Sequence, residues 1–336
     1  DSYDFLKKTA LYGGELLFLK RGDIGRVYLF EMKTDHATVA PNLYLLKLNN
    51  LSNSTYLYYF FQSNLGQGLL KSKNASSTLG ALYKDDVKSI EIPLPPTIEE
   101  QKAIAQVLSD TDSLIQALEK KIAKKKLIKK GVMQRLLEPR EGWGEYKLGQ
   151  IVEFYKGKGL SKGKISSKGK YPCLLYGELF TTYKEVIEKV ISRTEFLEGV
   201  LSKSGDVLMP GSTTTSGIDL AIASALKVDN VLLGGDINVL RPKVEINSEF
   251  LSRYLTNNKK TEIVNETQGI TIIHLYGHRL KNLIIKVPMI ETQNHITKIL
   301  SDIDKEIELL EQKLSKYQLA KQGMMQQLLT GKIRLV

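Results

Sequence analysis

The sequence predicts an α+β protein in which two globular domains of mixed strands and short helices are separated by two long antiparallel coiled-coil helices. Two observations predict this class. One pattern of residues occurs twice along the chain, and each copy ends in a long run of apolar residues at helical spacing. We expect a first domain at residues 1–95, a central helix at 96–140, a second domain at 141–287 and a C-terminal helix at 288–336.

Three matched segments define the repeat. IPLPPTIEEQ at residues 92–101 resembles IKVPMIETQ at 285–293, IAQVLSDTD at 104–112 resembles ITKILSDID at 296–304, and GVMQRLL at 131–137 resembles GMMQQLL at 323–329. The spacing is 192 residues in each case, as counted from Pro96 to Pro288, Ser109 to Ser301 and Gln134 to Gln326. A constant spacing over so long a stretch indicates an internal duplication.

Weaker matches extend the repeat toward the N-terminus. They are Phe-Leu at residues 5–6 and 196–197, Gly-Glu at 14–15 against Gly-Asp at 205–206, and Leu-Tyr at 82–83 and 275–276. The second copy begins near Trp143, so the first copy lacks a counterpart of residues 143–191. We therefore expect a first domain that is incomplete at its N-terminal side, and a natural protein with a shortened first domain is the alternative.

Each long helix has one apolar stripe with steps of four and three residues, which is the spacing of a coiled-coil seam. The seam residues are Ile104, Leu108, Ile115, Leu118, Ile122 and Leu136 in the first helix, and Leu300, Ile303, Ile307, Leu310, Leu314 and Leu328 in the second. Pro96 and Pro288 precede the helices, where proline is tolerated. Burial of two separate helices in a bundle is the alternative to their pairing with each other.

Short elements are expected in the domains. Alternating apolar residues predict strands at 207–209, 221–223, 237–240 and 283–285, and helical spacing predicts a short helix at 250–256. The aromatic run at residues 56–61 is interpreted as a packed helix rather than a base-stacking platform, because its counterpart at 250–255 is less aromatic.

Composition narrows the class of partner and the compartment. The net charge is +11, with 48 Lys and Arg against 37 Asp and Glu, which favours an anionic partner such as nucleic acid. The single cysteine, Cys173, excludes an internal disulfide and a site of several thiolates. We expect a buried free thiol and, since no stretch is long and apolar enough to span a membrane, a cytoplasmic protein without a membrane partner.

Two polar stretches of the second copy, and one of the first, are candidate DNA contacts. Residues 155–172 are rich in lysine and glycine and contain no acidic residue, residues 211–217 (GSTTTSG) carry four hydroxyls, and residues 20–26 correspond to the latter in the first copy. Lysines neutralise phosphates, glycines let the backbone approach them closely, and hydroxyls donate hydrogen bonds to phosphates or base edges. The candidates are Lys20, Arg21, Arg26, Lys156, Lys158, Lys162, Lys164, Lys168, Lys170, Ser212, Thr213, Thr214 and Thr215. A solvated loop and an ordinary turn are the alternatives.

The sequence offers no constellation for catalysis. It has no Gly-rich phosphate loop, no Asn-Pro-Pro-Tyr/Phe motif of an amino-methyltransferase, and no zinc-like spacing among Cys173 and the four histidines. Asp110 and Asp112 recur as Asp302 and Asp304, but residues two apart on a helix do not face each other. We interpret these aspartates as surface or partner contacts, and we expect no catalytic residue, no metal and no cofactor.

The chain resembles the specificity subunit of type I restriction-modification systems. The residues that carry this resemblance are the strand-to-helix passage from Ile90 to Gln101, the stretch from Trp143 to Gly149, and the closing MQQLLTGK at 325–332. The resemblance covers nearly the whole chain, and its motifs are specific only in combination. The incomplete first domain is the departure from the family pattern, and it puts the reading of one half-site in doubt.

This resemblance implies two target-recognition domains that each read one half of a bipartite double-stranded DNA site. It further implies that the helices set the spacer between the half-sites and dock modification subunits, which methylate adenine, and a restriction subunit, which translocates DNA. The subunit itself would have no catalytic activity. A coiled-coil scaffold without a DNA-reading role is the alternative, and a DNA methyltransferase is disfavoured by the missing motifs.

Overall fold

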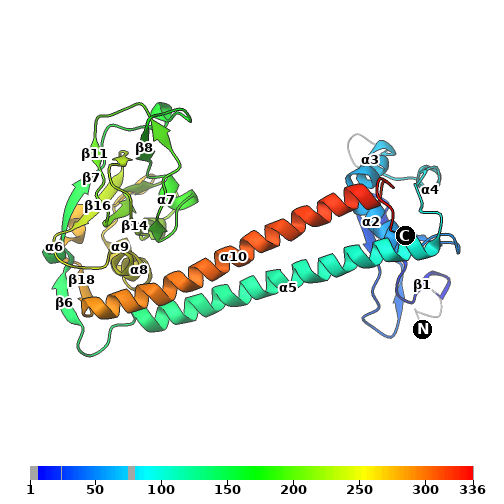
Figure 1. Cartoon of the computed structure of the whole chain (residues 1–336), viewed down its shortest axis with the longest axis horizontal. Coiled ribbons are helices and arrows are strands. Elements are labelled where there is room, and N and C mark those ends of the chain that lie inside the picture. Colours follow the sequence, from blue (N-terminus) through cyan, green and yellow to red (C-terminus); the bar gives the residue numbers. More distant parts are fainter. Residues whose placement is uncertain (1–6, 24, 75–79, 336) are drawn as a thin grey trace. The chain divides into compact units, whose positions relative to one another are not determined.

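The chain forms two compact units, which a computed structural model describes for residues 7–23, 25–74 and 80–335. The first unit comprises residues 1–124 and 308–336, and the second comprises residues 125–307 (Figure 1). The boundary therefore divides both long helices, so that each unit contains a part of each. Phe5 and Leu6 of the repeat, and Ile24 within the 20–26 stretch, lie outside the described residues.

The long helices are α5 (Ile98–Leu137) and α10 (Ile290–Leu328), and each is roughly 60 Å long at 1.5 Å per residue. In the first unit, Lys321 of α10 binds Asp112 of α5 with an N–O distance of 2.5 Å. In the second unit, Lys129 of α5 binds Asp304 of α10 at 2.6 Å. Residue numbers thus rise along α5 as they fall along α10, which confirms the predicted antiparallel pairing.

The helix faces that turn toward each other carry the predicted seam. Most of its residues are buried, namely Ile104, Leu108, Ile115, Leu118, Ile122, Leu300, Ile307 and Leu328. The remaining four, Leu136, Ile303, Leu310 and Leu314, are half-buried. Leu127, which lies off the seam, is 71% exposed.

The first unit is built on a three-stranded antiparallel sheet in the order β3-β2-β5. Its short elements are η1 (Lys7–Thr9), β1 (Ala10–Leu11), β2 (Leu16–Leu19), β3 (Val27–Leu29), β4 (Ala37–Thr38), β5 (Leu43–Leu46), α2 (Ser54–Gln62), α3 (Asn64–Ser72) and α4 (Lys84–Lys88). Helix α2 carries the aromatic run, and Tyr56, Tyr59, Phe60 and Phe61 are buried, so the run is a packed helix as expected. Its core also takes Ile104 and Leu108 from α5, and Leu328 from α10.

The second unit contains a five-stranded sheet in the order β7-β16-β12-β14-β9 and a four-stranded sheet in the order β10-β8-β15-β11. Its first elements are β6 (Gly144–Lys147), α6 (Leu148–Ile151), β7 (Val152–Lys156), η2 (Lys162–Lys164), β8 (Tyr171–Leu174), α7 (Glu178–Thr181), β9 (Val186–Ile187), β10 (Arg193–Thr194), β11 (Val200–Leu201), β12 (Asp206–Pro210), β13 (Ser212–Thr213) and η3 (Gly217–Leu220). The rest are β14 (Ser224–Leu226), β15 (Leu232–Leu233), β16 (Ile237–Pro242), α8 (Ser248–Asn258), α9 (Lys260–Asn265), β17 (Ile273–His274), η4 (Gly277–Asn282) and β18 (Ile284–Val287).

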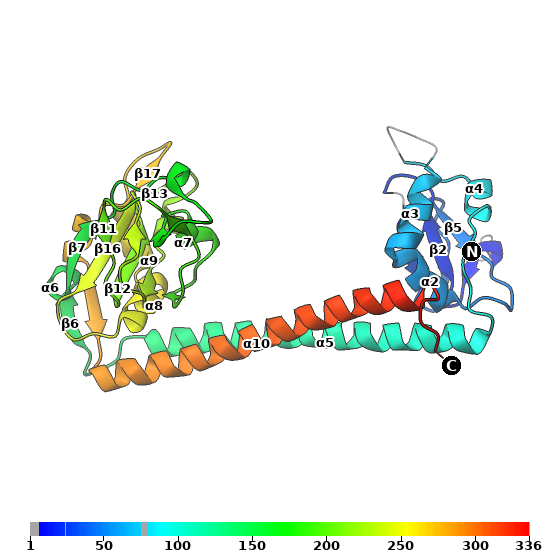
Figure 2. The same cartoon turned by 45° about the horizontal axis from the view of Figure 1, so that its top comes forward.

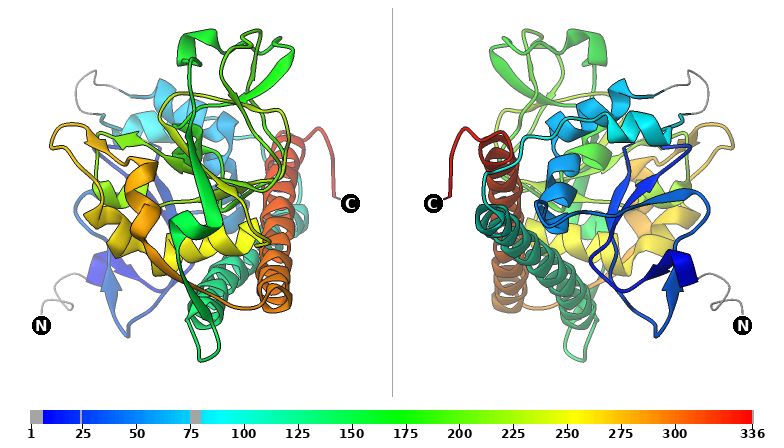
Figure 3. Two further views of the ribbon diagram at one scale, coloured as in Figure 1. Left: turned by 90° about the vertical axis from the view of Figure 1, so that its left-hand side faces the viewer. Right: turned by 90° about the vertical axis from the view of Figure 1, so that its right-hand side faces the viewer.

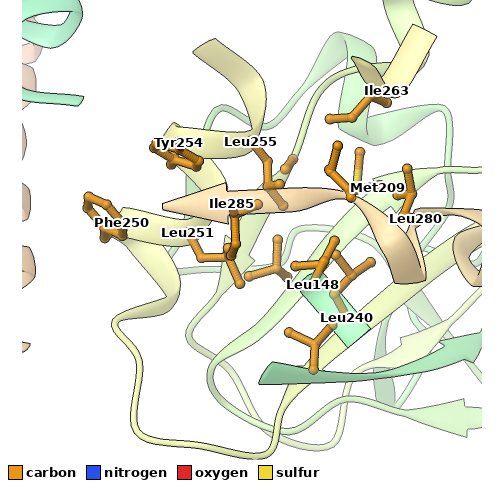
Figure 4. Close-up of a cluster of buried hydrophobic side chains, with 14 of the residues drawn as sticks. Leu148, Met209, Leu240, Phe250, Leu251, Tyr254, Leu255, Ile263, Leu280 and Ile285 are labelled. Atoms are coloured by element: carbon orange, nitrogen blue, oxygen red, sulfur yellow. The ribbon is translucent and has the colours of Figure 1, made fainter. Parts of the chain in front are cut away.

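Helix α8 lies between the five-stranded sheet and α10 (Figures 1 and 3). Its apolar side contributes Phe250, Leu251, Tyr254 and Leu255 to the largest core cluster (Figure 4). Leu137 at the end of α5 and Leu300 of α10 complete this cluster. The cores of both units therefore depend on residues of both long helices.

The repeat is visible as one shared substructure in the two units. Strands β3-β2-β5 with helix α2 correspond to β14-β12-β16 with helix α8. The register agrees as well, because Leu16 lies opposite Leu46 in the first unit and its counterpart Val207 lies opposite Leu240 in the second.

The same joint fastens each domain helix to its long helix. The Asn53 side chain caps α2, and its backbone N–H donates to Oε1 of Gln101 on α5 at 2.9 Å. The Asn247 side chain caps α8, and its backbone N–H donates to Oε1 of Gln293 on α10, also at 2.9 Å. Gln101 and Gln293 are themselves buried and 192 residues apart, so the joint is part of the duplication.

One predicted strand is wrong and the others are confirmed. Residues 221–223 form no strand, and β14 begins only at Ser224. The reason is that the Ala221 N–H closes the 3-10 turn onto the Ile218 carbonyl, and the Ala223 N–H donates to the Thr256 hydroxyl of α8. These backbone donors are bonded to a turn and a helix side chain, so no neighbouring strand pairs with them.

Cys173 is a buried free thiol, as expected, and burial raises its pKa to about 11. Among the described residues, no helix is long and apolar enough to cross a membrane.

Truncating the seam should destabilise the protein far more than truncating the outer face of the same helix. Leu118 is 7% exposed and Leu127 is 71% exposed. Leu118→Ala should lower the free energy of unfolding in urea by about 2–5 kcal/mol, because it removes buried methyl groups and leaves a cavity. Leu127→Ala should change it by less than about 0.5 kcal/mol. Equal effects of the two changes would show that α5 does not pair through this seam.

The ion pair at the start of α5 should make stability depend on acid pH. Arg334 binds both carboxylate oxygens of Glu100, and this hydrogen bonding lowers the pKa of Glu100 below its ordinary value of 4.5. A carboxylate whose pKa is lower in the folded than in the unfolded state stabilises the fold at pH values above its unfolded-state pKa. This stabilisation is lost as the pH falls through the folded-state pKa. Arg334→Met should therefore lower the melting temperature at pH 7, and the difference from the parent should shrink below about pH 4.5. Lys332→Met, an exposed cation nearby, should show no such pH dependence.

Candidate nucleic-acid interface

Asp236 organises the edge of the second unit that carries β13, and Figure 2 shows β13 and β17 at the end of this unit away from α10. Its carboxylate accepts a hydrogen bond from the Ser212 hydroxyl at 3.0 Å and binds the Lys156 ammonium at 3.3 Å. Its carbonyl accepts from the Gly211 N–H at 2.6 Å, and its φ of 60° is a left-handed conformation that few residues adopt. Asp236 thereby ties the end of β7 to β13. Ser212 is only 5% exposed and uses its hydroxyl within the protein.

Three stacked rings lie along the same edge, on and after β17. His274 stacks on Tyr276 with an angle of 16° between the ring planes, and His278 is tilted by 33° against Tyr276; both centroid separations are 5.9 Å, and we call these three rings the ring stack. The Lys156 ammonium lies 5.9 Å from the Tyr276 ring centroid. Aromatic rings at a surface can stack on bases, and a cation beside them can neutralise a phosphate.

The ring stack was not predicted from the sequence, although a signal for it exists. His274, Tyr276 and His278 alternate with the buried residues Leu275 and Gly277, so the three rings share the outer face. Two histidines four residues apart are usually interpreted as a possible metal-binding pair, so this spacing alone does not predict neighbouring rings. Among the described residues, no group of histidine, cysteine and acidic side chains could hold a metal ion.

The hydroxyl-rich turn after β13 is partly ordered by its own side chains. The hydroxyls of Thr213 and Thr215 lie 2.9 Å apart, and the Thr215 hydroxyl donates to Asp219. Ser216 caps η3. Thr214 is exposed at the tip of the turn, so its hydroxyl is the one most available to a ligand.

The lysine-rich stretch is exposed, but its lysines differ in their surroundings. The Lys164 ammonium lies 3.3 Å from the Phe196 ring centroid and donates to the Gly159 carbonyl at 3.1 Å. Lys170 lies near the Tyr171 ring. Lys158, Lys162 and Lys168 are exposed, and the described residues provide no ion pair for them.

Glycines in this stretch serve the packing of the loop. A Cβ on Gly157 would lie 1.9 Å from the Gly234 carbonyl oxygen, and a Cβ on Gly169 would lie 2.4 Å from the Thr194 nitrogen. Arg193 holds the loop by donating to the Gly169 carbonyl at 2.7 Å. These two glycines let the loop lie close to the protein's own backbone, a packing role that the sequence did not reveal.

The first unit presents different residues at the equivalent edge. The Leu82 N–H donates to the Lys20 carbonyl at 2.9 Å, as the Leu275 N–H does to the Gly211 carbonyl. The backbone of Arg21 forms an antiparallel β-bridge with that of Ala81, just as Ser212 pairs with His274 between β13 and β17. The exposed ring of Tyr83 takes the place of Tyr276.

The basic side chains of this edge lie around a hollow of about 370 Å³. Lys20 lies over the Tyr44 ring at 4.7 Å and donates to the Pro41 carbonyl, and Arg21 lines the same hollow. Arg26 is exposed and pairs with Asp23 at 2.6 Å. The structure thus places Lys20 and Arg21 together, and Arg26 is engaged with its own neighbour.

Comparison with known proteins assigns the family. The model of the type I restriction modification DNA specificity domain matches residues 1–127 and again residues 140–317, one match for each copy of the repeat. The chain belongs to this family. It is a specificity subunit of the type I restriction-modification class.

Individual relatives agree with this assignment. The chain is 28% identical over 303 residues to the type I restriction enzyme MjaVIII specificity subunit of Methanocaldococcus jannaschii, covering 83% of this chain and 70% of that one. It is 27% identical over 368 residues to the putative MjaX specificity subunit of the same organism, covering 98% of this chain and 81% of that one.

Solved structures show the same fold. The S subunit of a type I restriction-modification system from M. genitalium matches with a TM-score of 0.60 at 19% identity, covering 96% of this chain and 84% of that one. A chain from a study of complex assembly in the type I system matches with a TM-score of 0.55 at 14% identity, covering 95% of this chain and 82% of that one.

Removing the least engaged lysines of the specificity subunit should weaken its binding to all DNA sequences alike. Replacing Lys158, Lys162, Lys168 and Lys170 by Ala should reduce the slope of log binding constant against log salt by about 0.9 for each phosphate that is no longer neutralised. A matched variant removes four exposed lysines elsewhere in the second unit, namely Lys243, Lys260, Lys281 and Lys298. An equal reduction of the slope in both variants would mean that the stretch contributes only general charge.

Proposed function

We propose that this specificity subunit reads a bipartite double-stranded DNA site, one half with each unit. The observation that carries the proposal is a shared scaffold with different residues at one equivalent edge. Both units repeat the same sheet, helix and joint and carry a tyrosine at one edge, yet beside it the first unit presents Lys20 and Arg21 while the second presents Thr214, His274 and His278. Base edges are read by side chains, so two domains that read different half-sites need different side chains at equivalent positions of a shared scaffold.

We further propose that the two helices act as the ruler between the half-sites. A long helix is stiff and has a fixed rise per residue, so its length and its register against its partner set a distance. DNA also has a fixed rise per base pair, and the number of unread base pairs should therefore follow the helices.

The outer faces of the helices support a role in docking modification subunits. Leu127 and Leu319 are 71% and 64% exposed, although both are large apolar residues. They are 192 residues apart, so they occupy equivalent positions of the repeat. Equivalent exposed leucines would suit two copies of one methyltransferase subunit, since identical partners bind equivalent surfaces.

The subunit's part in the reaction is selection of the site, with no catalytic step of its own. The modification subunits would supply methyl transfer, and the restriction subunit that the family resemblance implies would join the same complex. The basic charge of the chain and its paired DNA-reading edges suit this division of work.

The test is to change one edge and examine both half-sites. In a complex with the modification subunits, fragments bound from a random DNA library should share a two-part sequence. Thr214→Ala combined with Tyr276→Ala should relax or change one half only, since removing a side chain that reads a base costs about 1–3 kcal/mol of discrimination at that base alone. Thr292→Ala, at the start of α10, is the matched control and should leave both halves unchanged. Bound fragments without a shared sequence would favour a scaffold that does not read DNA.

A further inference from the structure

The repeated aspartate pairs on the long helices have two kinds of surroundings. Asp110 and Asp302 are exposed and interact only along their own helix, with Gln106 at 2.7 Å and Lys298 at 3.5 Å respectively. Asp112 and Asp304 are half-buried and turn toward the partner helix. The sequence repeats both aspartates, but only the second of each pair crosses between the helices.

In the first unit, Asp112 of α5 joins three elements. One carboxylate oxygen binds the Lys321 ammonium of α10 at 2.5 Å. The other accepts a hydrogen bond from the Tyr59 hydroxyl of α2 at 2.9 Å. The Lys321 ammonium also lies 5.4 Å from the Tyr59 ring centroid, so the three side chains form one cluster.

The second unit repeats this arrangement with the helices exchanged. One oxygen of Asp304 on α10 binds the Lys129 ammonium of α5 at 2.6 Å, and the other accepts from Arg253 of α8 at 2.9 Å. Lys129 and Lys321 are 192 residues apart, as are Asp112 and Asp304, so both partners of the cross-helix pair are duplicated. The domain residue differs, Tyr59 in one unit and Arg253 in the other, and Lys129 also lies 3.8 Å from the carboxylate of Glu185.

The positions that either aspartate would face after a shift of the helices by one heptad are apolar. Such a shift, seven residues, keeps an apolar seam in contact with an apolar seam. It would move Asp112 from Lys321 to Leu314 or Leu328. The same shift would move Asp304 from Lys129 to Ile122 or Leu136. Both aspartates would then face a leucine or isoleucine, where a charge has no partner.

Arg253 adds to the cost of such a shift in the second unit. It is one of the largest fully buried side chains, and its Nε and Nη1 have no hydrogen-bond partner among the described residues. Its bond to Asp304 is therefore the one that neutralises a buried guanidinium. Removing the partner of a buried charge is strongly unfavourable.

We propose that Asp112–Lys321 and Asp304–Lys129 are register pins, which fix how far α5 is shifted along α10 and thereby which spacer length the subunit accepts. A polar pair within an apolar seam is the known means of specifying register in coiled coils, at some cost in stability. These four residues position the two DNA-reading units and need not touch DNA. The spacer part of this inference rests on the proposed function, whereas the register part does not.

Register is measured by disulfide trapping in the full chain. Counted from the pins, Ile122 lies within one residue of the level of Leu310, and after a one-heptad shift Tyr317 or Ile303 would take the place of Leu310. Oxidation should trap Ile122→Cys with Leu310→Cys in the parent, and should not trap Ile122→Cys with Tyr317→Cys or with Ile303→Cys. Cys173 is buried and does not compete. The pins are removed by Asp112→Asn with Asp304→Asn, and the matched control is Asp110→Asn with Asp302→Asn.

The pin variant should give at least roughly a tenth of its product through one of the shifted cysteine pairs, and the control should give none. Asp112→Glu with Asp304→Glu, which keeps both charges, should restore the single register. In the complex with modification subunits, the pin variant should also accept spacers changed by about three base pairs, because seven residues span about 10 Å. The half-sites themselves should not change.

A single trapped register in the folded pin variant would overturn the proposal and assign the register to the helix-end leucines in the domain cores. Shifted trapping together with an unchanged spacer would uphold the pins and overturn the ruler. If the parent shows no half-site preference, the DNA-reading function fails, and the trapping result still decides on the pins. Circular dichroism of each variant separates a register shift from unfolding.

Discussion

The antiparallel contact between α5 and α10 is the constraint on which both units depend. The core of the first unit combines residues 16–108 with Leu328 and Leu329, which lie more than two hundred positions later in the sequence. The core of the second unit includes Leu137, the last residue of the helix that begins in the first. The core of the first unit is thus completed only when α10 has returned to it, whereas Leu137 directly precedes the second domain in sequence. Folding of the first unit therefore needs contacts that are distant in the chain, and such contacts are costly to form because long loops must close first.

The duplication is strict at the hydrogen-bonded joints that cap α2 and α8 and loose where the edges face outward. Asn53 with Gln101, and Asn247 with Gln293, place equal hydrogen bonds at equal distances. A buried donor or acceptor left without its partner costs more than the bond itself contributes, so either side of this joint is difficult to change alone. A loop that ends in solvent carries no such penalty. The physical cost of change, rather than the function alone, explains why the joints match and the edges do not.

The sequence predicted the parts of the fold that repeat regularly and missed those that depend on side-chain partners from elsewhere. The helices and their seam follow from spacing alone, because a period of three and four residues defines one face. Their antiparallel direction was predicted from the duplication instead, since two tandem copies that each end in a helix can be related by a twofold axis only when the helices run antiparallel. The failure at residues 221–223 has a different cause, since the alternation was real but the Ala223 N–H bonds to Thr256 of a helix far along the chain. The role of Asp236 was missed for the same reason, because its neighbours in the sequence do not reveal that the distant residues Ser212 and Lys156 bind its carboxylate.

The candidate site shows the same division. Lysine and glycine content marked residues 155–172 as exposed, but it did not show that Gly157 and Gly169 fit against backbone or that Lys164 covers Phe196. The ring stack was accessible in principle through the alternation of residues 274–278, yet two histidines four residues apart are more familiar from metal sites than from stacked rings.

The polar residues of the seam illustrate a general limit of apolar pairing. Leucine and isoleucine stripes stabilise two helices in any register that brings stripe to stripe, so stability alone does not select one. The carboxylate faces an ammonium in one register. After a shift of one heptad in either direction it faces a leucine or isoleucine, so one alignment of the helices is favoured over its neighbours. In this chain the duplication supplies that distinction twice, with Asp112 and Asp304 on opposite helices. Both ends of the helix pair then specify the same alignment, and a disturbance at one end is opposed at the other.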